Sequence, residues 1–222
     1  MSSAKKKLLI KRYLMMLIGI FFVGICVGLY RLGEFGADAF TCMNLGMCEF
    51  FPVSFGTCQL LTNAAIMIAV FFKARHCIGA GTIVNMATVG YLADFICWMV
   101  KDLLQIHMTL PLRLAALILG SLFAGLGIAL YMAADAGIAA YDSAAIIIED
   151  MTHGRIPFQF ARVISDITII IIGVIFCLLA GGNVWLILGF GTIYTALVHG
   201  PLIQFFKTHA ADPIMGSSRT TR

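Results

Sequence analysis

Long apolar runs separated by short polar stretches make up most of the chain. Six runs have the length expected of helices that cross a bilayer, at residues 13–30, 55–72, 77–100, 114–134, 163–182 and 184–206. A spanning helix needs about 20 apolar residues, within a range near 17–25. Two further apolar segments, 37–51 and 138–148, are too short to cross. We predict six spanning helices and two short helices that are either re-entrant or interfacial.

The pattern of the first half recurs in the second half. Each half follows its first run with a break that contains glycines and carboxylates, LYRLGEFGADAFT at 29–41 and LYMAADAGIAAYD at 130–142. At constant spacing, the matched residues are Glu34 with Asp135, Gly36 with Gly137 and Phe40 with Tyr141. Each predicted half holds three spans, an odd number, so the second half would cross in the opposite direction. The pattern therefore predicts two inverted repeats, an arrangement found in many secondary transporters.

The predicted chain is one membrane domain with polar ends. Its parts are a basic cytoplasmic N-terminus (1–12), a first membrane repeat (13–100), a linker (101–113), a second membrane repeat (114–206) and a polar tail (207–222). The tail is polar and contains proline and glycine, so we expect it to be disordered.

Composition places the chain in the lipid bilayer. Hydrophobic residues make up 61% and charged residues only 12%, whereas soluble domains have about 25% charged residues. The predicted fold class is an all-α polytopic membrane bundle. The seven cysteines form no CxxC or Cys/His cluster, so no metal or other cofactor is expected. A disulfide bond between Cys42 and Cys48 is the alternative to two free thiols.

Charge predicts the orientation of the spans. The chain has 15 lysine and arginine residues. In the six-span arrangement all but three lie on the same side of the membrane as the N-terminus, and the exceptions are Arg31, Lys101 and Arg113. Cytoplasmic loops are enriched in these residues. We therefore expect a multi-pass protein of the bacterial plasma membrane with both termini in the cytoplasm. Because the net charge of +4 is confined to ends and loops, no nucleic-acid partner is expected.

Polar residues within or beside the predicted spans are candidates for binding a substrate or an ion. An ionisable group inside a bilayer costs roughly 2.5–3.5 kcal/mol on insertion scales, so it needs a partner or a function. The candidates are Asn63, Asn85, Asp94, Asp135, Asp142, Arg162, Asp166, His199 and Gln204.

Several candidates have structural alternatives. Arg162 and Asp166 lie four residues apart on one predicted helix, so they can neutralise each other. Asp94 can instead extend to the outer interface near Trp98 and Lys101.

The remaining alternatives concern helix ends and packing. Asp142 can cap a short helix, and Asp135 precedes a turn at Gly137. His199 can be a packed, hydrogen-bonded histidine, and Asn85 can join two helices by a hydrogen bond.

Three stretches resemble the YczE/YyaS/YitT-like family of bacterial integral membrane proteins, and its YczE-like members most closely. The stretches are 54–57, 78–94, and 127–142 together with 189–204. Thr41 departs from the family pattern, which has a closing aspartate at this place in the first break. The resemblance implies a plasma-membrane protein with a transport role and no established substrate.

These observations favour a permease or secondary transporter of a small molecule or ion, working by alternating access. Asp166 or His199 would carry a proton if transport is proton-coupled. The alternative is a non-transporting accessory or assembly protein of a membrane complex. An enzyme is not expected, because HExxH and GxSxG motifs are absent. The sequence does not decide between a monomer and a homo-oligomer.

Overall fold

A computed structural model describes residues 3–73, 75, 78–137, 139–152, 155–156 and 158–215, and no strand occurs in these ranges. Four helices are long and apolar enough to cross a membrane, at Lys5–Gly33, Phe55–Lys73, Ala80–Leu103 and Leu110–Ala134. They correspond to α1 (Ser3–Gly33), α3 (Phe55–Lys73), α4 (Ala80–Trp98) with the π-helix η2 (Met99–Leu103), and α5 (Leu110–Ala134). The predicted all-helical class is confirmed.

The last two predicted spans are organised differently from each other. The first is α7 (Phe158–Leu179), whose apolar part is Val163–Leu179. The second is divided into α8 (Val184–Ile187) and α9 (Phe190–Phe206). The prediction of one helix over 184–206 was therefore wrong. Gly189 has an extended backbone, and its N–H faces the Thr192 hydroxyl at 3.5 Å, so a new helix begins there.

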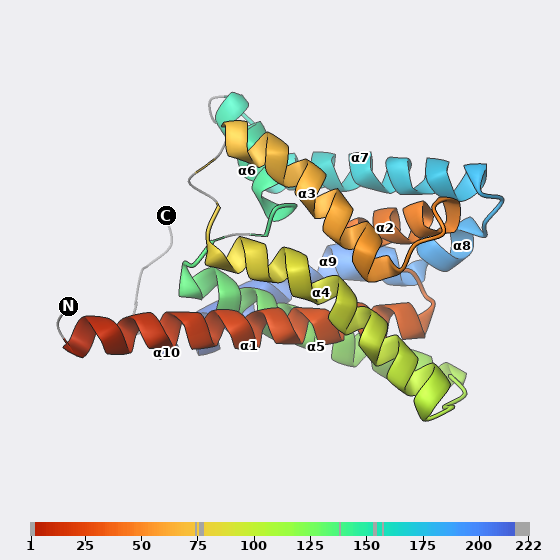
Figure 1. Ribbon diagram of the computed structural model, residues 1–222, viewed down its shortest axis with the longest axis horizontal. Coiled ribbons are helices and arrows are strands. Elements are labelled where there is room, and N and C mark those ends of the chain that lie inside the picture. The colour runs from red at the N-terminus through yellow and green to blue at the C-terminus, as the bar shows by residue number, and fades with distance from the viewer. Residues whose placement is uncertain are drawn as a thin grey trace.

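Two short helices follow the breaks, α2 (Ala39–Phe50) and α6 (Asp142–Met151). The Asp38 side chain caps α2 by accepting from the Thr41 backbone N–H at 3.2 Å and its hydroxyl at 2.7 Å. Helix α2 lies beside α7 (Figure 1). A Cβ on Gly46 would lie 2.0 Å from the Gly173 carbonyl oxygen, so only glycine permits this approach.

The core lies where α1 packs against α4 and α5, with α9 on the other side of α5 (Figure 1). Its buried side chains include Met16, Ile20, Val89 and Leu130. Small residues bring the backbones together: a Cβ on Gly127 would lie 2.7 Å from the carbonyl oxygen of Gly19. Close backbone packing of this kind is characteristic of membrane helices.

The linker and the tail contain more helix than expected. Only residues 104–109 connect η2 to α5, whose first turn holds Pro111. The chain continues after α9 as the π-helix η3 (Lys207–Ala211) and α10 (Asp212–Met215), where we expected disorder. Ala211 is buried and Met215 packs against the same core as α1 and α5, which explains the added order. Residues 216–222 lie outside the described part.

Candidate functional site

The two breaks have positive φ angles at the same matched positions. Glu34 has φ of 54° and Gly36 has φ of 90°, while Asp135 has φ of 50° and Gly137 has φ of 114°. A left-handed backbone at a non-glycine residue is uncommon. The matched residues of the two breaks thus share a positive φ.

Each break contacts the first turn of a helix from the other half of the chain. At the first break contact, the Phe35 carbonyl accepts a hydrogen bond from the Gly191 N–H at 2.6 Å. At the second break contact, the Ala136 carbonyl accepts from the Gly81 N–H at 2.8 Å. The tripeptide Gly-Thr-Ile occurs at both 81–83 and 191–193, but the sequence did not predict that either glycine would bind the opposite break.

Glycine is required at both break contacts. A Cβ on Gly36 would lie 2.5 Å from the Gly189 backbone nitrogen, and one on Gly137 would lie 2.6 Å from the Gly79 backbone nitrogen. Gly36 and Gly137 also have positive φ, which residues other than glycine adopt at a cost in free energy. The two contacts are therefore close backbone junctions with no room for side chains.

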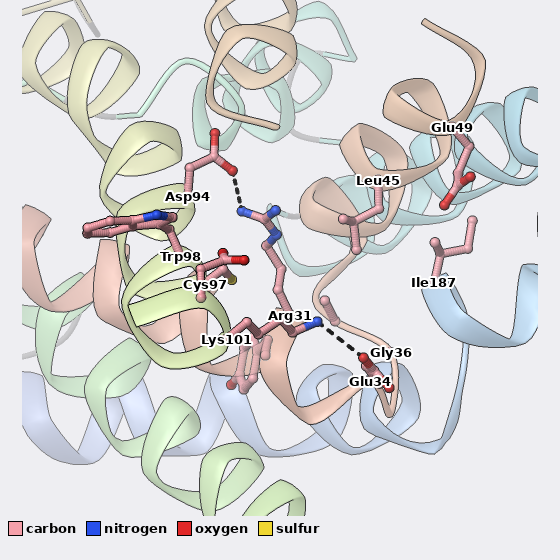
Figure 2. Close-up of a pocket in the computed structure, with 13 residues that line it drawn as sticks. Arg31, Glu34, Gly36, Leu45, Glu49, Asp94, Cys97, Trp98, Lys101 and Ile187 are labelled. Atoms are coloured by element: carbon pink, nitrogen blue, oxygen red, sulfur yellow. Dashed lines mark hydrogen bonds and ion pairs between the residues drawn. The ribbon is translucent and has the colours of Figure 1, made fainter. Parts of the chain in front are cut away.

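A pocket of about 420 Å³ lies beside the first break contact. Its walls come from the end of α1, the break, α2, the end of α4 with η2, and α8. Figure 2 shows Asp94 and Trp98 on one side of it, with Glu49 and Ile187 across from them. Gly36 and Ala37 belong to the lining, so the pocket ends at the break.

Asp94 is a predicted site residue that lines this pocket, and it is held by two groups. Its Oδ1 pairs with the Arg31 guanidinium at 2.6 Å, and its Oδ2 accepts from the Gly56 N–H at 2.7 Å (Figure 2 draws the first). The guanidinium also lies 4.2 Å from the centre of the Phe55 ring, a cation–π contact. Asp94 thus joins α1, α3 and α4 instead of extending freely to the interface. Gln204, another predicted site residue, is exposed, and its side-chain amide donates to the Thr208 hydroxyl at 3.3 Å.

A second ion-pair group uses residues that the sequence analysis did not select as a site. Glu34 pairs with Lys101 at 3.4 Å and with Arg113 at 3.0 Å, which joins the end of α1 to η2 and to the start of α5. Lys101 and Arg113, together with Arg31, are the three basic residues that the charge distribution placed on the side opposite the N-terminus. Their isolation among apolar runs was the signal that could have identified the pocket.

His199 is partly buried and belongs to a polar cluster around Tyr30, which also lines the pocket. The Tyr30 hydroxyl is 2.9 Å from the Ser121 hydroxyl and 2.6 Å from His199 Nε2, and the rings of Tyr30 and His199 stack. Tyr30 is only 1% exposed. This geometry agrees with a packed, hydrogen-bonded histidine.

Tyrosines bind two of the predicted carboxylates. The Tyr141 hydroxyl donates to Asp166 Oδ1, and the Tyr131 hydroxyl donates to Asp142 Oδ2. The Tyr141 ring stacks on Phe40 at 4.9 Å, which links the two break segments. The predicted Arg162–Asp166 pair cannot be followed, because the Arg162 side chain lies outside the described residues.

The other predicted residues are not brought to the pocket. Asn63 and Asn85 are buried, and the Asn63 side-chain amide donates to the Gln59 carbonyl at 3.0 Å. Asp135 lies beside Arg12 at 3.8 Å with its side chain 83% exposed.

The described cysteines form no metal site. Cys42 donates to the Ile187 carbonyl, and both Cys42 and Cys48 are free thiols. Within the described part of the chain, no group of three or more His, Cys, Asp or Glu residues is placed to hold a metal ion.

Comparison with known proteins agrees with the resemblance in the sequence. The chain is 25% identical over 203 residues to "Uncharacterized membrane protein YczE" of Bacillus subtilis (strain 168), covering 90% of this chain and 87% of that protein. No solved structure gives a significant match. The model of the family of unknown function DUF6198 matches residues 10–208. Because this match covers most of the sequence, the chain belongs to that family.

Proposed function

We propose that this chain is a secondary transporter of a small solute that works by alternating access in the bacterial plasma membrane. The observation that carries the proposal is the pair of reciprocal break contacts, Phe35 with Gly191 and Ala136 with Gly81. Transporters built from two repeats use such interrupted segments as paired gates around a central site. Opening one contact while the other stays closed would expose the interior to one side at a time.

The proposal includes six spans in two inverted repeats. The matched φ angles of the breaks and the exchange of equivalent hydrogen bonds support a pseudo-symmetric arrangement. Helices α1 and α5 run in opposite directions in Figure 1, as do α4 and α9. In this proposal α7 and α9 also cross the bilayer, while α2 and α6 are re-entrant.

The pocket supports access from the side opposite the N-terminus. It reaches the first break contact, where Gly36 and Ala37 form part of its wall. We place this pocket on the outer face and the first break contact at its base. The cluster of Tyr30, Ser121 and His199 and the Tyr141–Asp166 bond are candidate carriers of a coupling proton.

Glycine-to-alanine variants test the two gates. In proteoliposomes with a pH gradient and a panel of small metabolites, we expect uptake by the wild type. Gly36→Ala and Gly137→Ala should each slow it by about 10-fold, because the added methyl group disrupts a junction the transport cycle must re-form. Gly33→Ala is the matched control, since a Cβ there would make only an ordinary contact, 3.4 Å from the Arg113 carbonyl oxygen.

Two outcomes would contradict the proposal. One is wild-type uptake equal to that of protein-free liposomes across the panel. The other is unchanged uptake in both break variants. Either result would favour the accessory or assembly role, which isolation of membrane partners would then test.

A further inference from the structure

Two cysteines from consecutive helices face each other. Cys48 lies in the last turn of α2, and Cys58 lies in the first turn of α3. Their thiols share a hydrogen bond. The Cys58 thiol also donates to the Asn44 carbonyl oxygen at 3.6 Å, and Asn44 is one helical turn before Cys48. The packing of α2 against α3 therefore positions this thiol pair.

Further contacts hold the two helices together around the pair. The Thr62 hydroxyl, one turn after Cys58, lies 3.8 Å from the Met47 sulfur. Cys48 packs against the core cluster that contains Phe55, the first residue of α3. These contacts lie on both sides of the pair, so they keep the two thiols facing each other, as a disulfide bond requires.

Other described cysteines direct their thiols to backbone carbonyls. Cys42 donates to the Ile187 carbonyl at 2.6 Å, and Cys97 donates to the Gly28 carbonyl at 3.7 Å. Cys42, which the sequence offered as a disulfide partner of Cys48, thus faces α8 instead. The structure favours Cys58 as the partner.

The thiol pair lies beside an exposed connection. Residues 51–54 join α2 to α3 and are all exposed. Figure 1 shows this connection at the end of the molecule away from the N-terminus. With the N-terminus in the cytoplasm, this end faces the outside of the plasma membrane. Disulfide bonds form and persist in such oxidising surroundings, whereas cytosolic thiols stay reduced.

We infer that Cys48 and Cys58 are a modification site, at which exchange with a disulfide-bearing oxidant outside the cell joins them in a disulfide bond. Cys48 is partly exposed and Cys58 is buried, so the Cys48 thiolate attacks the oxidant first. This step forms a mixed disulfide and releases one thiol. Cys58 then attacks the Cys48 sulfur and releases the second thiol. The pair loses two electrons and two protons, and the oxidant gains them.

The disulfide bond would tie the end of α2 to the start of α3. Because α2 follows the first break, the bond would fix the helix that begins at the first break contact. The inference uses the orientation given above but needs no transport activity.

Mass spectrometry of the full-length protein tests the site. Free thiols are blocked with N-ethylmaleimide in intact cells, and the purified protein is digested with chymotrypsin, which cuts after the phenylalanines between the two cysteines. We expect the peptides that carry Cys48 and Cys58 to be joined, and dithiothreitol to separate them. Cys58→Ser should abolish the link, whereas the matched control Cys97→Ser should retain it.

Thermal unfolding of the purified protein gives a second measurement. A cross-link stabilises a fold by restricting the unfolded chain. Oxidation of reduced protein with glutathione disulfide should therefore raise the midpoint of thermal unfolding by about 5 °C. The same treatment should leave the midpoint of Cys58→Ser unchanged.

Three results would overturn the inference. Both cysteines could carry N-ethylmaleimide after blocking in intact cells. Cys48 could be linked to Cys42 instead of Cys58. Glutathione could stay attached to Cys48 in the purified protein while Cys58 remains a free thiol, which would show that the second exchange step does not occur. None of these results depends on solute uptake, so the modification site and the proposed transporter can fail separately.

Discussion

Arg31 and Asp94 form a short ion pair between side chains that are 19% and 25% exposed. Asp94→Asn keeps the shape but leaves the guanidinium without its counter-charge. We expect the free energy of unfolding to fall by about 1–3 kcal/mol, measured by SDS titration in mixed micelles. Arg31→Gln should have a similar effect, and the double variant should lose less than the two single losses combined.

The control at this scale is Asp135→Asn. The Asp135 carboxylate is 83% exposed and lies 3.8 Å from Arg12, so its removal should change the free energy of unfolding by at most about 0.5 kcal/mol. An equal loss of unfolding free energy in Asp94→Asn and Asp135→Asn would mean that the partial burial of the Arg31–Asp94 pair adds nothing to its stability.

At the scale of elements, the contact between α2 and α7 depends on two glycines. Gly46→Ala would place a methyl group 2.0 Å from the Gly173 carbonyl oxygen, so the helices must separate. We expect a loss of about 1–3 kcal/mol in the free energy of unfolding, the usual cost of overpacking, measured by the same titration. Gly33→Ala, where a Cβ would lie 3.4 Å from the nearest atom, the Arg113 carbonyl oxygen, should be neutral or stabilising. Equal behaviour of the two variants would show that α2 does not pack here.

At the scale of the whole molecule, the last described helix, α10, packs against the first, α1. Met215 of α10 packs against the core cluster that contains Met15 and Met16 of α1. With the basic residues concentrated on the side of the N-terminus, we expect both termini in the cytoplasm. A green fluorescent protein fused to the C-terminus should fluoresce. Alkaline phosphatase inserted in the 104–109 connection should be active. Active alkaline phosphatase fused to the C-terminus would instead show that the orientation is the opposite of the predicted one.

The length of the apolar runs was sufficient to predict most of the helices. Apolar runs of bilayer length and the glycine–carboxylate breaks predicted the helical class and the positions of α2 and α6, because these features depend on neighbouring residues. The same reasoning failed at 184–206, where the backbone at Gly189 ends one helix and begins another. A single apolar run does not reveal such an interruption, since Leu188 and Gly189 leave its hydropathy unchanged.

The site depended on contacts between distant segments. Composition and spacing by themselves determined the helical class, the charged breaks and Asp94 as a candidate. Only the tertiary structure decided that Asp94 binds Arg31, 63 residues away, and that Phe35 and Ala136 bind the helix starts of opposite halves. The physical reason is that helix spacing specifies which face a residue occupies, whereas the packing of several helices decides which faces meet.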